Sequence, residues 1–493
     1  MNVGWVARLL GVSIPQGASS TPISDLAYDS RLVTPGCLFF CIRGGAQDGH
    51  DWAVQAVEGG AVALVCERPL GLGVPELVVP DSRAAMNRLA SPFFKEPSQE
   101  VQVVGITGTN GKTTIAFMLE SIFRANGEKA GLVGTVETRV AGQVLAAGRT
   151  TPEAIDLQRL LRRMSNEGVS RCALEVTSIG IERGRTEGLH LAVAVFTNLT
   201  HDHLDHHGTM ERYYLAKKQL FQWPGLEGSV INLDDPYGRR LHSELTGSRE
   251  GSTERPAILT YGAGPPASLI GTDVVMGRDG STFRASGMGI DVKVMCRLPG
   301  TFNVSNSLAA VGAAHLAGIA PEVAAEGIGA LAYVPGRFEP VDEGQDFAVL
   351  VDYAHTPDSL GNVLRAARQL TEGKLIVVFG CGGDRDRAKR PVMGEIASKY
   401  ADLVVATSDN PRKESPAAIL ADIEAGLKKA PPPDGYSIVV DRAEAIEAAI
   451  TKARRGDVVV IAGKGHEKGQ EFADRVVPFE DRVVAAEALR NLL

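Results

Sequence analysis

The sequence predicts an α/β protein with three domains: a central phosphate-loop-type domain built on a mostly parallel sheet, an α/β N-terminal domain and a Rossmann-like C-terminal domain. Two observations predict this class. The 493 residues exceed what one hydrophobic core usually organises, so several domains are expected. Short apolar runs typical of buried strands also alternate with helical patterns, as in parallel sheets covered by helices on both faces. We expect the domains to span residues 1–99, 100–333 and 334–493.

The composition is that of a soluble globular protein and narrows the classes of partner. Hydrophobic residues make up 44% of the chain and charged residues 22%, and the net charge is −8, which argues against a nucleic-acid partner. No stretch reaches 18 apolar residues and residues 1–13 lack the basic start of a signal peptide, so we expect a cytoplasmic protein without a membrane span. The six cysteines form no C-x-x-C pair, as expected for reduced thiols: Cys37, Cys41, Cys66, Cys172, Cys296 and Cys381.

Residues 1–99 show strand and helix patterns in alternation. The apolar runs at residues 37–42 and 61–65 are typical of strands, and residues 52–57 between them have a helical pattern. A polar turn with several glycines, residues 43–50, follows the first of these strands. Such a β-α-β arrangement can bind a small molecule at its loops, but it is equally typical of a domain that only packs, so both interpretations stay open.

The chain is organised around a strand, a turn and a helix at residues 101–126. The apolar run at 101–106 leads into a turn that consists of Gly108, Thr109, Asn110, Gly111, Lys112, Thr113 and Thr114. The spacing departs from G-x-x-x-x-G-K-[ST], because Ile106 stands where the first glycine belongs. The physical requirements are still met, since glycines let backbone N–H groups face phosphate oxygens, Lys112 reaches the outer phosphates and Thr113 offers a hydroxyl to Mg²⁺. An ordinary strand-to-helix turn is the alternative.

Polar residues follow the strands of the predicted central sheet. Strand-like runs recur at residues 129–136, 172–176, 192–196 and 229–233. Glu175 ends the second of these runs, and a loop rich in Asp and His, residues 197–207, follows the third. Ligands of open α/β sheets bind at the carboxyl ends of the strands, so we expect an active site there. A carboxylate at the position of Glu175 can hold a metal ion, directly or through water.

The loop after the third run contains four histidines: His201, His203, His206 and His207. A zinc site is one interpretation, but the loop has no paired thiolate, and Asp202 and Asp205 lie between the imidazoles. Beside a nucleotide loop we favour Mg²⁺, held by oxygen ligands and waters with one imidazole. His206 and His207 are interpreted as solvated loop residues. Lys217 follows in a helical pattern and, from the residues alone, is an ordinary solvent-facing lysine.

The last unit repeats the pattern of apolar strands that lead into polar loops. Strand-like runs occur at residues 348–351, 374–379, 403–406, 437–440 and 457–461. Gly380 and Gly382 suggest a dinucleotide fingerprint, but Arg385 occupies its third glycine position, which argues against a nicotinamide site. A second loop consists of Asp409, Asn410, Pro411 and Arg412, and Arg412 offers a fork for a carboxylate. Together with Arg385, Lys464 and Glu467 this loop fits a zwitterionic amino acid; a set of loop salt bridges is the alternative.

Several motifs in a fixed order resemble those of the Mur ligase family. These are Gly108-Thr109-Asn110-Gly111-Lys112-Thr113, Thr150-Thr151-Pro152, Glu175-Val176-Thr177-Ser178, Thr197-Asn198-Leu199, Asp202-His203-Leu204-Asp205, Pro335-Gly336-Arg337 and Asp352-Tyr353-Ala354-His355. The resemblance covers nearly the whole chain. It implies an ATP-dependent, amide-bond-forming ligase that adds meso-diaminopimelate to UDP-N-acetylmuramoyl-L-alanyl-D-glutamate through an acyl phosphate. It also implies a role in peptidoglycan precursor synthesis, and hence in cell-wall biogenesis, cell shape and cell division.

The resemblance further implies roles for individual residues. The UDP part is expected near Tyr28, Ser30, Gly45, Ala46 and Gln47, and the muramoyl-dipeptide near Thr150, Thr151, Thr177, Arg183 and Arg185. ATP is expected on the turn from Gly108 to Thr114, with Asn306, Arg337, Asp352 and His355 nearby. Mg²⁺ is expected on Thr113, Glu175, His203 and Lys217, with Lys217 carbamylated, and the catalytic residues are Lys112, His203 and Lys217. Diaminopimelate is expected at Arg385, Asp409, Asn410, Pro411, Arg412, Gly463 and Glu467.

The sequence departs from the family pattern after Glu175. Thr177 replaces a Ser, Ile179 stands where relatives often have His, and Arg183 stands where Gln is common. Thr177 keeps the hydroxyl donor, so contact with the substrate can persist. Ile179 has no polar side-chain atom, which puts the role of that histidine in doubt here.

Two alternatives to this reaction differ in their acceptor. A folylpolyglutamate synthetase or another Mur enzyme is the nearest, but an acceptor with one carboxylate does not need both Arg385 and Arg412. A regulatory or transport ATPase belongs to another class, and its turnover would not depend on an amino acid. The implied partners are small molecules, and we expect a monomer.

Overall fold

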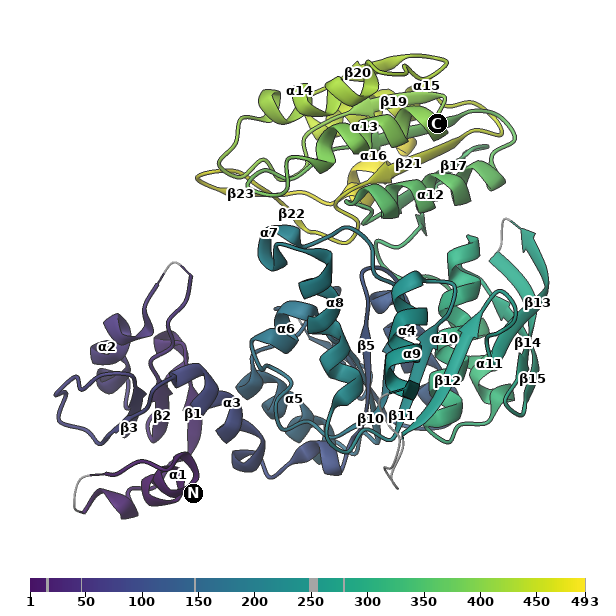
Figure 1. The fold of residues 1–493 in the computed structure, drawn as a ribbon. Coiled ribbons are helices and arrows are strands. Elements are labelled where there is room, and N and C mark those ends of the chain that lie inside the picture. The colour runs from purple at the N-terminus through teal and green to yellow at the C-terminus, as the bar shows by residue number, and fades with distance from the viewer. Residues whose placement is uncertain (15–16, 46, 146–147, 248–255, 278–279, 493) are drawn as a thin grey trace. The chain divides into compact units, whose positions relative to one another are not determined.

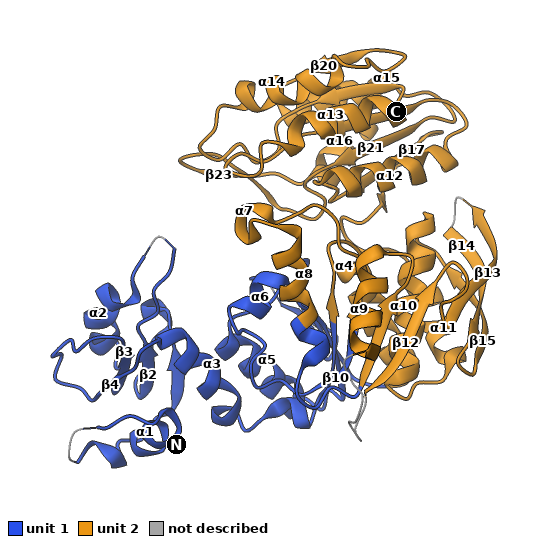
Figure 2. Ribbon diagram, viewed as in Figure 1, with its two compact units in different colours: residues 1–105, 128–194, 219–227 blue, residues 106–127, 195–218, 228–493 orange. Residues whose placement is uncertain are grey.

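The computed structural model describes residues 1–14, 17–45, 47–145, 148–247, 256–277 and 280–492. The chain divides into two compact units (Figure 2): residues 1–105, 128–194 and 219–227 form the first, and residues 106–127, 195–218 and 228–493 form the second. The sheets and the helices that cover them confirm the predicted α/β class (Figure 1). The boundaries at residues 99/100 and 333/334 stay predictions.

The first unit contains a parallel sheet in the order β1-β2-β3-β4. Its strands are β1 (Asp25–Ala27), β2 (Cys37–Phe40), β3 (Ala63–Cys66) and β4 (Glu76–Val78). Strands β2 and β3 are wholly buried, because α1 (Val3–Leu10) and α3 (Ser82–Phe93) pack on one face and α2 (Ala53–Glu58) on the other. The side chains of Asn2 and Asp81 accept backbone N–H groups at the starts of α1 and α3, so local sequence sets where these helices begin.

The largest sheet has eleven strands in the order β15-β14-β13-β12-β11-β10-β5-β9-β6-β7-β8. The strands are β5 (Gln102–Thr107), β6 (Ala130–Val133), β7 (Thr138–Val140), β8 (Gln143–Leu145), β9 (Arg171–Glu175), β10 (Leu191–Phe196), β11 (Gly228–Asn232), β12 (Ala257–Gly262), β13 (Leu269–Gly277), β14 (Gly280–Gly287) and β15 (Ile290–Cys296). Strands β11, β12 and β13 pair in parallel, as do β6 and β9. Antiparallel strands extend the sheet at both ends, through β7 and β8 and through β14 and β15.

Eight α-helices lie between or after these strands within the described residues. They are α4 (Lys112–Ala125), α5 (Ala154–Asn166), α6 (Ser178–Glu182), α7 (Leu204–His207), α8 (Met210–Lys218), α9 (Pro236–Gly247), α10 (Thr301–Leu316) and α11 (Pro321–Ala330). Most of α4 is buried, and every residue of β10 is buried. Such continuous apolar strands are expected where both faces of a sheet are covered.

The third sheet lies in the second unit and has the order β16-β17-β21-β18-β19-β20. Its strands are β16 (Glu339–Pro340), β17 (Ala348–Asp352), β18 (Leu375–Phe379), β19 (Leu403–Ala406), β20 (Tyr436–Ile438) and β21 (Val458–Ala462); all neighbours are parallel except β16 and β17. One face packs against α12 (Pro357–Leu370), α13 (Lys389–Tyr400) and α14 (Pro416–Leu427), and the other against α15 (Arg442–Lys452) and α16 (Asp481–Leu492). A hairpin of β22 (Gly469–Glu471) and β23 (Val476–Pro478) follows β21.

The predicted polar loops lie at the carboxyl ends of these strands. The phosphate loop follows β5, residues 177 and 197–205 follow β9 and β10, and residues 352–355 end β17 and continue beyond it. Residues 380–386 follow β18, residues 409–412 follow β19 and residues 463–467 follow β21. The carboxyl edge is where open α/β sheets bind ligands, so the topology favours the predicted placement of the site.

All six cysteines are buried and none forms a disulfide. Burial raises the pKa of the Cys41 thiol to about 12 and that of Cys66 to about 11.

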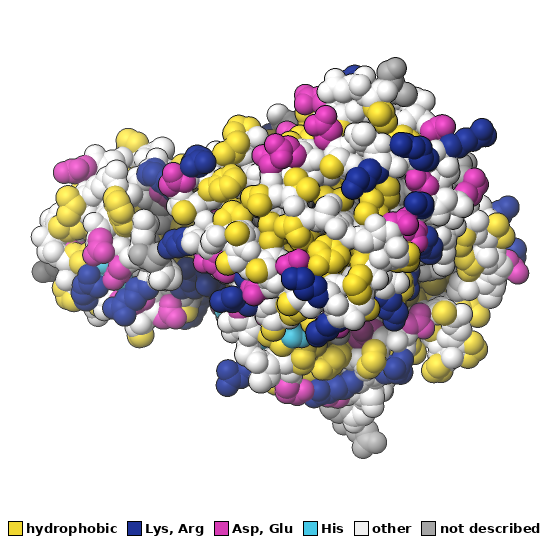
Figure 3. Space-filling view, turned by 90° about the horizontal axis from the view of Figure 1, so that it is seen from above, with side chains coloured by type: hydrophobic (Ala, Val, Ile, Leu, Met, Phe, Trp, Pro, Cys, Tyr) yellow, Lys and Arg dark blue, Asp and Glu magenta, His cyan; other side chains and the backbone are white. Residues whose placement is uncertain are grey.

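The surface carries charges of both signs: on the face that Figure 3 shows, Lys and Arg side chains lie among Asp and Glu side chains. Among the described residues, no helix is long and apolar enough to cross a membrane.

Candidate active site

The phosphate loop requires glycine at two positions. Gly108 has φ +149° and Gly111 has φ +90°, values that L side chains rarely adopt. A Cβ atom at Gly108 would overlap the hydroxyl oxygen of Thr197, and one at Gly111 would lie 2.6 Å from Oδ1 of Asn306. The loop backbone therefore lies too close to its neighbours for any side chain at these two positions.

Lys112 lies over its own loop. Its Nζ donates to the carbonyl oxygens of Gly108 and Thr109, both at 2.8 Å. Lys112 also begins α4, whose first residue follows the left-handed Gly111 without a side-chain cap. The first turn of a helix carries backbone N–H groups and a positive dipole end that suit an anion. An ammonium and a helix N-terminus thus meet at the predicted phosphate site.

The loop after β10 holds the phosphate loop in shape. Asn198 accepts the backbone N–H of Asn110 through its side chain and that of Thr109 through its carbonyl, both at 2.9 Å. The hydroxyl of Thr197 donates to the carbonyl of Asn110 at 2.6 Å. The sequence indicated a polar loop at this edge but not this supporting role, which depends on contacts between separate strands.

A cation from the last third of the chain reaches the phosphate loop. Arg337 donates from Nη2 to the hydroxyl of Thr113 at 3.1 Å, and its guanidinium lies 4.7 Å from the ring centroid of Tyr353. The Tyr353 ring also contacts the rings of His355 and His466. The three rings are inclined to one another and form an aromatic cluster around the guanidinium of Arg337. The sequence did not indicate Tyr353 or His466 as site residues.

Asp352 shapes the turn that carries Arg337. Its carboxylate accepts the backbone N–H groups of Phe338 and Ala354, both at 2.7 Å. Burial raises the pKa of Asp352 to about 6, although the charge of Arg337 and these two hydrogen bonds oppose the shift. Asp352 therefore joins two backbone segments.

Lys217 is buried, so the interpretation as a solvent-facing lysine is wrong. Its Nζ donates to the carbonyl of Gly108 at 2.9 Å and lies 4.7 Å from the ring centroid of Tyr213. Burial, together with the charge of Lys112, lowers the pKa of Lys217 well below its usual value. The packing of α8 against the phosphate loop causes this burial, and helical periodicity alone does not reveal it.

The histidine-rich loop combines exposed and buried rings. His203 has φ +53° and donates its backbone N–H to Oδ1 of Asp202 at 2.9 Å. Partial desolvation and the nearby ammonium groups lower the pKa of His203 to about 4, despite the opposing charge of Asp202, so its imidazole is neutral at pH 7. His206 is exposed as expected. His207 is buried and stacks on Tyr213, so its interpretation as a solvated residue is wrong.

The donors predicted for Mg²⁺ have the chemistry that this ion prefers. Thr113 offers a hydroxyl, Glu175 a carboxylate and His203 a neutral imidazole, and a carbamate on Lys217 would add an oxygen anion. The Glu175 carboxylate is buried at the end of β9, where it accepts the backbone N–H (2.9 Å) and the hydroxyl (3.0 Å) of Thr135. Glu175 belongs to the first unit and the other three residues to the second. The donor set fits the ion.

The residues expected to bind UDP lie in the first unit. The Tyr28 hydroxyl donates to Asp156 at 2.5 Å, and the Ser30 hydroxyl donates to Gln55 at 2.7 Å. Gly45 and Gln47 are exposed in a turn that is closed by the backbone N–H of Gly44 donating to the carbonyl of Gln47. Ala46 lies outside the described residues.

The residues expected near the dipeptide are connected through Thr151. Its hydroxyl donates to the carbonyl of Glu175 at 2.9 Å and accepts the backbone N–H of Thr177 at 3.0 Å. Arg185 donates to the Thr151 carbonyl at 3.0 Å. The Thr150 hydroxyl lies 3.0 Å from that of Thr135, and Arg183 is exposed.

A buried carboxylate that the sequence did not indicate collects three arginines beside these residues. Glu153 pairs with Arg83 and Arg149, both at 2.7 Å, and with Arg185 at 3.0 Å. The carboxylate is almost fully buried, whereas Arg149 is half-exposed. One carboxylate therefore faces three guanidinium groups. The excess of positive charge in this cluster suits a polyanionic substrate.

The loops expected to bind the amino acid form one hydrogen-bond network. Asn410 accepts from Nζ of Lys464 and from the backbone N–H of Glu471, both at 2.9 Å. Glu467 accepts from the same Nζ and from the amide of Asn410, both at 2.8 Å. The Lys464 side chain is fully buried. Three of the predicted groups therefore meet, with Lys464 at the centre.

The two arginines of the predicted acceptor site differ in their surroundings. Arg412 has φ +52°, and its guanidinium donates to Glu471 and to the carbonyl of Gly383, both at 2.9 Å. Arg385 is exposed and donates to the carbonyl of its neighbour Asp384. Pro411 precedes the strained Arg412 backbone. A Cβ atom at Gly463 would lie 2.5 Å from Oδ2 of Asp409, so glycine permits this close approach.

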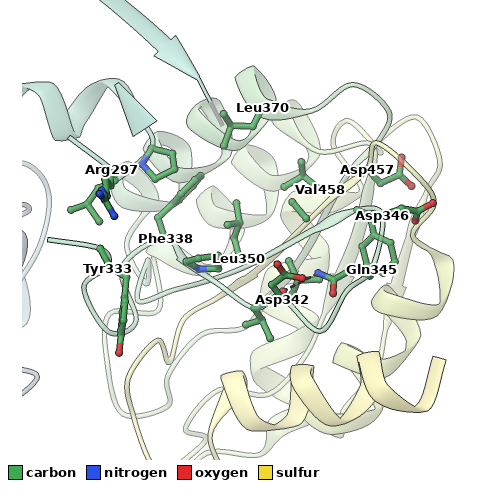
Figure 4. Close-up of a pocket in the computed structure, with 18 of the residues that line it drawn as sticks. Arg297, Tyr333, Phe338, Asp342, Gln345, Asp346, Leu350, Leu370, Asp457 and Val458 are labelled. Carbon is green, nitrogen blue, oxygen red and sulfur yellow. Dashed lines mark hydrogen bonds between the residues drawn. The ribbon is translucent and has the colours of Figure 1, made fainter. Parts of the chain in front are cut away.

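A cavity of about 740 Å³ in the second unit contains none of the predicted site residues (Figure 4). Its lining includes Arg297, Tyr333, Phe338 and Leu350, and the acids Asp342, Asp346 and Asp457. The predicted site residues of this unit follow the carboxyl ends of strands instead, and their roles stay predictions.

Three family models match the chain. The Mur ligase family catalytic domain matches residues 22–94, the Mur ligase middle domain residues 106–314, and the Mur ligase glutamate ligase domain residues 336–465. The chain belongs to the Mur ligase family. The resemblance drawn from the motifs is confirmed, and with it the ligase class.

Individual members of the Mur ligase family are similar over the whole chain. The UDP-N-acetylmuramoyl-L-alanyl-D-glutamate–2,6-diaminopimelate ligase of Geobacillus thermodenitrificans is 46% identical over 99% of this chain and 98% of its own length. A solved structure named for the same ligase activity has 33% identity and a TM-score of 0.69, covering 100% of this chain and 99% of its own. A structure of MurF from Acinetobacter baumannii has a TM-score of 0.71 at 18% identity, over 100% of this chain and 98% of its own, and so shares the fold.

Proposed function

We propose that this protein is an ATP-dependent ligase that adds meso-diaminopimelate to the D-glutamyl residue of UDP-N-acetylmuramoyl-L-alanyl-D-glutamate, a step in peptidoglycan precursor synthesis. The observation that carries the proposal is the acceptor network of Asn410, Lys464 and Glu467 beside the guanidinium of Arg412. Full-length relatives named for this reaction support it.

The first half-reaction forms an acyl phosphate. The γ-carboxylate of the D-glutamyl residue attacks the γ-phosphorus of ATP, the bond between that phosphorus and the bridging oxygen breaks, and ADP leaves. Lys112 would exchange the carbonyls of Gly108 and Thr109 for phosphate oxygens, and the N-terminus of α4 would bind the phosphates through backbone N–H groups. Arg337, already at Thr113, supplies a second cation for the charge that develops.

The second half-reaction forms the amide. The amine of meso-diaminopimelate attacks the acyl carbon, and the tetrahedral intermediate expels phosphate. Arg412 would bind the far carboxylate as a two-pronged donor, and Asp409 and Glu467 would bind the ammonium at that end. Lys464 holds Glu467 in place, since its buried Nζ donates to that carboxylate. These contacts orient the acceptor so that its reacting amine meets the acyl phosphate.

We propose that Thr113, Glu175, His203 and a carbamylated Lys217 hold magnesium. Magnesium, when bound, neutralises negative charge on the phosphates of ATP. The neutral amine of Lys217 can add to carbon dioxide, forming the carbamate and releasing a proton. Its burial and lowered pKa support this assignment.

We propose that the first unit binds the UDP-muramoyl-dipeptide. The UDP part would contact Tyr28, Ser30, Gly45, Ala46 and Gln47, and the dipeptide would contact Thr150, Thr151, Thr177, Arg183 and Arg185. The three arginines around Glu153 support a polyanionic ligand there. ATP would also contact Asn306 and Asp352, and diaminopimelate Arg385, Pro411 and Gly463. We further propose that the protein acts as a monomer in the cytoplasm, with consequences for cell shape and division.

The test is an acceptor comparison in a phosphate-release assay with ATP and the UDP-muramoyl-dipeptide. We expect meso-diaminopimelate to exceed L-lysine in kcat/KM by about a thousandfold or more, because lysine lacks the far carboxylate that Arg412 would bind and brings its ammonium close to that guanidinium instead. Arg412→Ala should raise the KM for meso-diaminopimelate at least tenfold and narrow the gap to lysine, about the effect of losing one charged hydrogen-bond partner.

Arg387 provides the matched control. It belongs to the loop after β18, but its exposed guanidinium pairs with Asp422 and not with the acceptor network. Arg387→Ala should leave both acceptor constants within about twofold, as is usual for exposed pairs. Equal use of lysine by the wild type would contradict the proposed acceptor, and phosphate release that needs no acceptor would favour an ATPase of another class.

A further inference from the structure

A fully buried ion pair lies next to the acceptor loops. Arg442 is the first residue of α15, and Asp481 is the first residue of α16. The guanidinium donates from Nε to Oδ1 of Asp481 at 2.7 Å and from Nη2 to Oδ2 at 2.8 Å, and neither side chain is exposed. Neither residue belongs to a sequence motif, and the proposed reaction uses neither.

Other N–H groups of Arg442 reach two carbonyls where the acceptor loops begin. Nη1 donates to the carbonyl of Ser408 at 3.3 Å, and Nη2 donates to the carbonyl of Ala462 at 3.0 Å. Ser408 directly precedes Asp409, and Ala462 directly precedes Gly463. Both acceptor loops therefore start from a carbonyl group that the same guanidinium binds.

The two loops belong to strands that are not neighbours. Strands β19 and β21 are separated by β18 in the sheet, so no backbone ladder joins them directly, although both pair with β18 as far as Phe379. The planar guanidinium of Arg442 can bind a carboxylate along one edge and carbonyl oxygens with its remaining donors. A lysine ammonium lacks this fork.

The charges around the pair explain why it is stable in the interior. Burial disfavours the charged form of Arg442, but Asp481 and the more distant Asp409 and Glu467 outweigh this effect and raise the pKa of Arg442. Asp481 lies at the N-terminus of α16, where the helix dipole favours an anion. The pair is thus neutral as a whole, and its cation faces the carboxylates of the acceptor site.

We propose that Arg442, held by Asp481, is a positioning residue for the amino-acid acceptor. By binding both carbonyls it fixes the loop that begins at Asp409 relative to the loop that begins at Gly463. The side-chain network of Asn410, Lys464 and Glu467 also joins these loops, but among the described side chains only Arg442 holds both loops at their first carbonyl groups. Without Arg442 the starts of the two loops would be less firmly fixed, and acceptor binding would weaken while nucleotide binding stays. This inference rests on the proposed function, because it concerns the same acceptor site.

The test removes both charges together. The double variant Arg442→Met with Asp481→Leu leaves no unpaired ion in the interior, and replacing a buried pair in this way is often tolerated. We expect its KM for meso-diaminopimelate to rise at least tenfold, while the KM values for ATP and for the UDP-muramoyl-dipeptide stay within twofold. Arg442→Lys and Asp481→Asn should shift the same constant in the same direction, and thermal melting reports whether each variant is folded.

The control is an ion pair beside the same sheet, between Arg368 in α12 and Asp402, which directly precedes β19 at the opposite ends of the strands. Arg368 pairs with Asp402 at 2.9 Å, and Asp402 accepts the backbone N–H of Leu375 at the start of β18. Arg368→Lys lowers stability without reaching the acceptor loops, so all three KM values should stay within twofold. This control distinguishes an effect on the stability of the protein from an effect on the positions of the acceptor loops.

The outcomes distinguish the possibilities. A folded variant with an unchanged acceptor KM, or with an equal rise in all three KM values, would overturn the inference. Failure of all three variants to fold would assign the pair to stability alone and would also overturn it. If the wild type does not ligate meso-diaminopimelate at all, the proposed function fails, and the wild-type measurement alone reveals that.

Discussion

A lysine amine shielded from water changes its chemistry, and Lys217 is in this situation. Its Nζ has a carbonyl oxygen and an aromatic ring as neighbours, and the charge of Lys112 further disfavours protonation. A neutral amine is a nucleophile that can take up carbon dioxide, whereas an ammonium cannot. Burial therefore converts a common cation into a candidate for modification.

We predict that Lys217→Ala lowers ligation at least a hundredfold, an estimate of the order seen when one charge-stabilising group is lost. Short-chain carboxylic acids should restore part of the activity by replacing the carbamate. Wild-type protein in ¹³C-labelled bicarbonate should give a carbamate NMR signal that Lys217→Ala lacks. The neighbouring Lys218 forms an ion pair with Glu244 at 2.8 Å, so Lys218→Ala should stay within about twofold. A wild-type protein without the signal would contradict the prediction.

The phosphate loop needs a particular backbone conformation and close packing at Gly108 in addition to its sequence motif. At Gly108 the backbone has φ +149° and lies against the Thr197 hydroxyl, so the strand-turn-helix unit closes only without a side chain. We predict that Gly108→Ala raises the KM for ATP at least a hundredfold or abolishes turnover, and lowers the melting temperature by several degrees, as estimated for about 2 kcal/mol of backbone strain.

Gly264 provides the comparison for this substitution. No atom lies within 4 Å of the position that its Cβ would occupy, and its φ is outside the positive range. Gly264→Ala should therefore leave the KM for ATP unchanged and the melting temperature the same or slightly higher. A Gly108→Ala protein that turns over ATP like the wild type would show that the loop accommodates a side chain.

Local elements were predictable, and contacts between distant elements were not. The strand, turn and helix around Lys112 follow from apolar periodicity and glycine placement, which are local signals. The acceptor network joins Asn410 to Lys464, 54 residues later, and no periodicity reports such a contact. The burial of Lys217 and His207 likewise depends on packing between elements. The acceptor residues stay a prediction from the loop sequences and the family resemblance, whereas the central position of Lys464 in their network required the structure.

At the scale of the whole molecule, the predicted ligands divide between the two units. The residues proposed for the UDP-muramoyl-dipeptide belong to the first unit, and the phosphate loop and acceptor loops belong to the second. The family could be identified from the sequence because its motifs occur in a fixed order along nearly the whole chain, and this order is visible without a structure. The units mix distant segments, as residues 106–127 and 195–218 join the second, so a linear reading cannot give them.

We predict that hydrogen exchange separates the two binding events. The UDP-muramoyl-dipeptide alone should slow amide exchange at residues 150–151 and 177–185, and a non-hydrolysable ATP analogue should slow it at residues 107–114 and 336–337. Strand β14 at the edge region of the large sheet serves as an internal reference and should not change. Protection by the UDP-muramoyl-dipeptide that is confined to the second unit would contradict the assignment.

The burial of all six cysteines has a practical consequence for labelling. Thiol reagents are attacked by the thiolate, and burial both hides these sulfurs and raises the pKa of Cys41 and Cys66 far above neutral pH. A new cysteine at an exposed position outside the proposed sites, such as Glu58 or Lys452, would therefore be the fastest-reacting thiol in the native protein. Fluorophores could be attached at one chosen site of each unit without first removing a native cysteine, so their separation could be followed by energy transfer as each substrate is added.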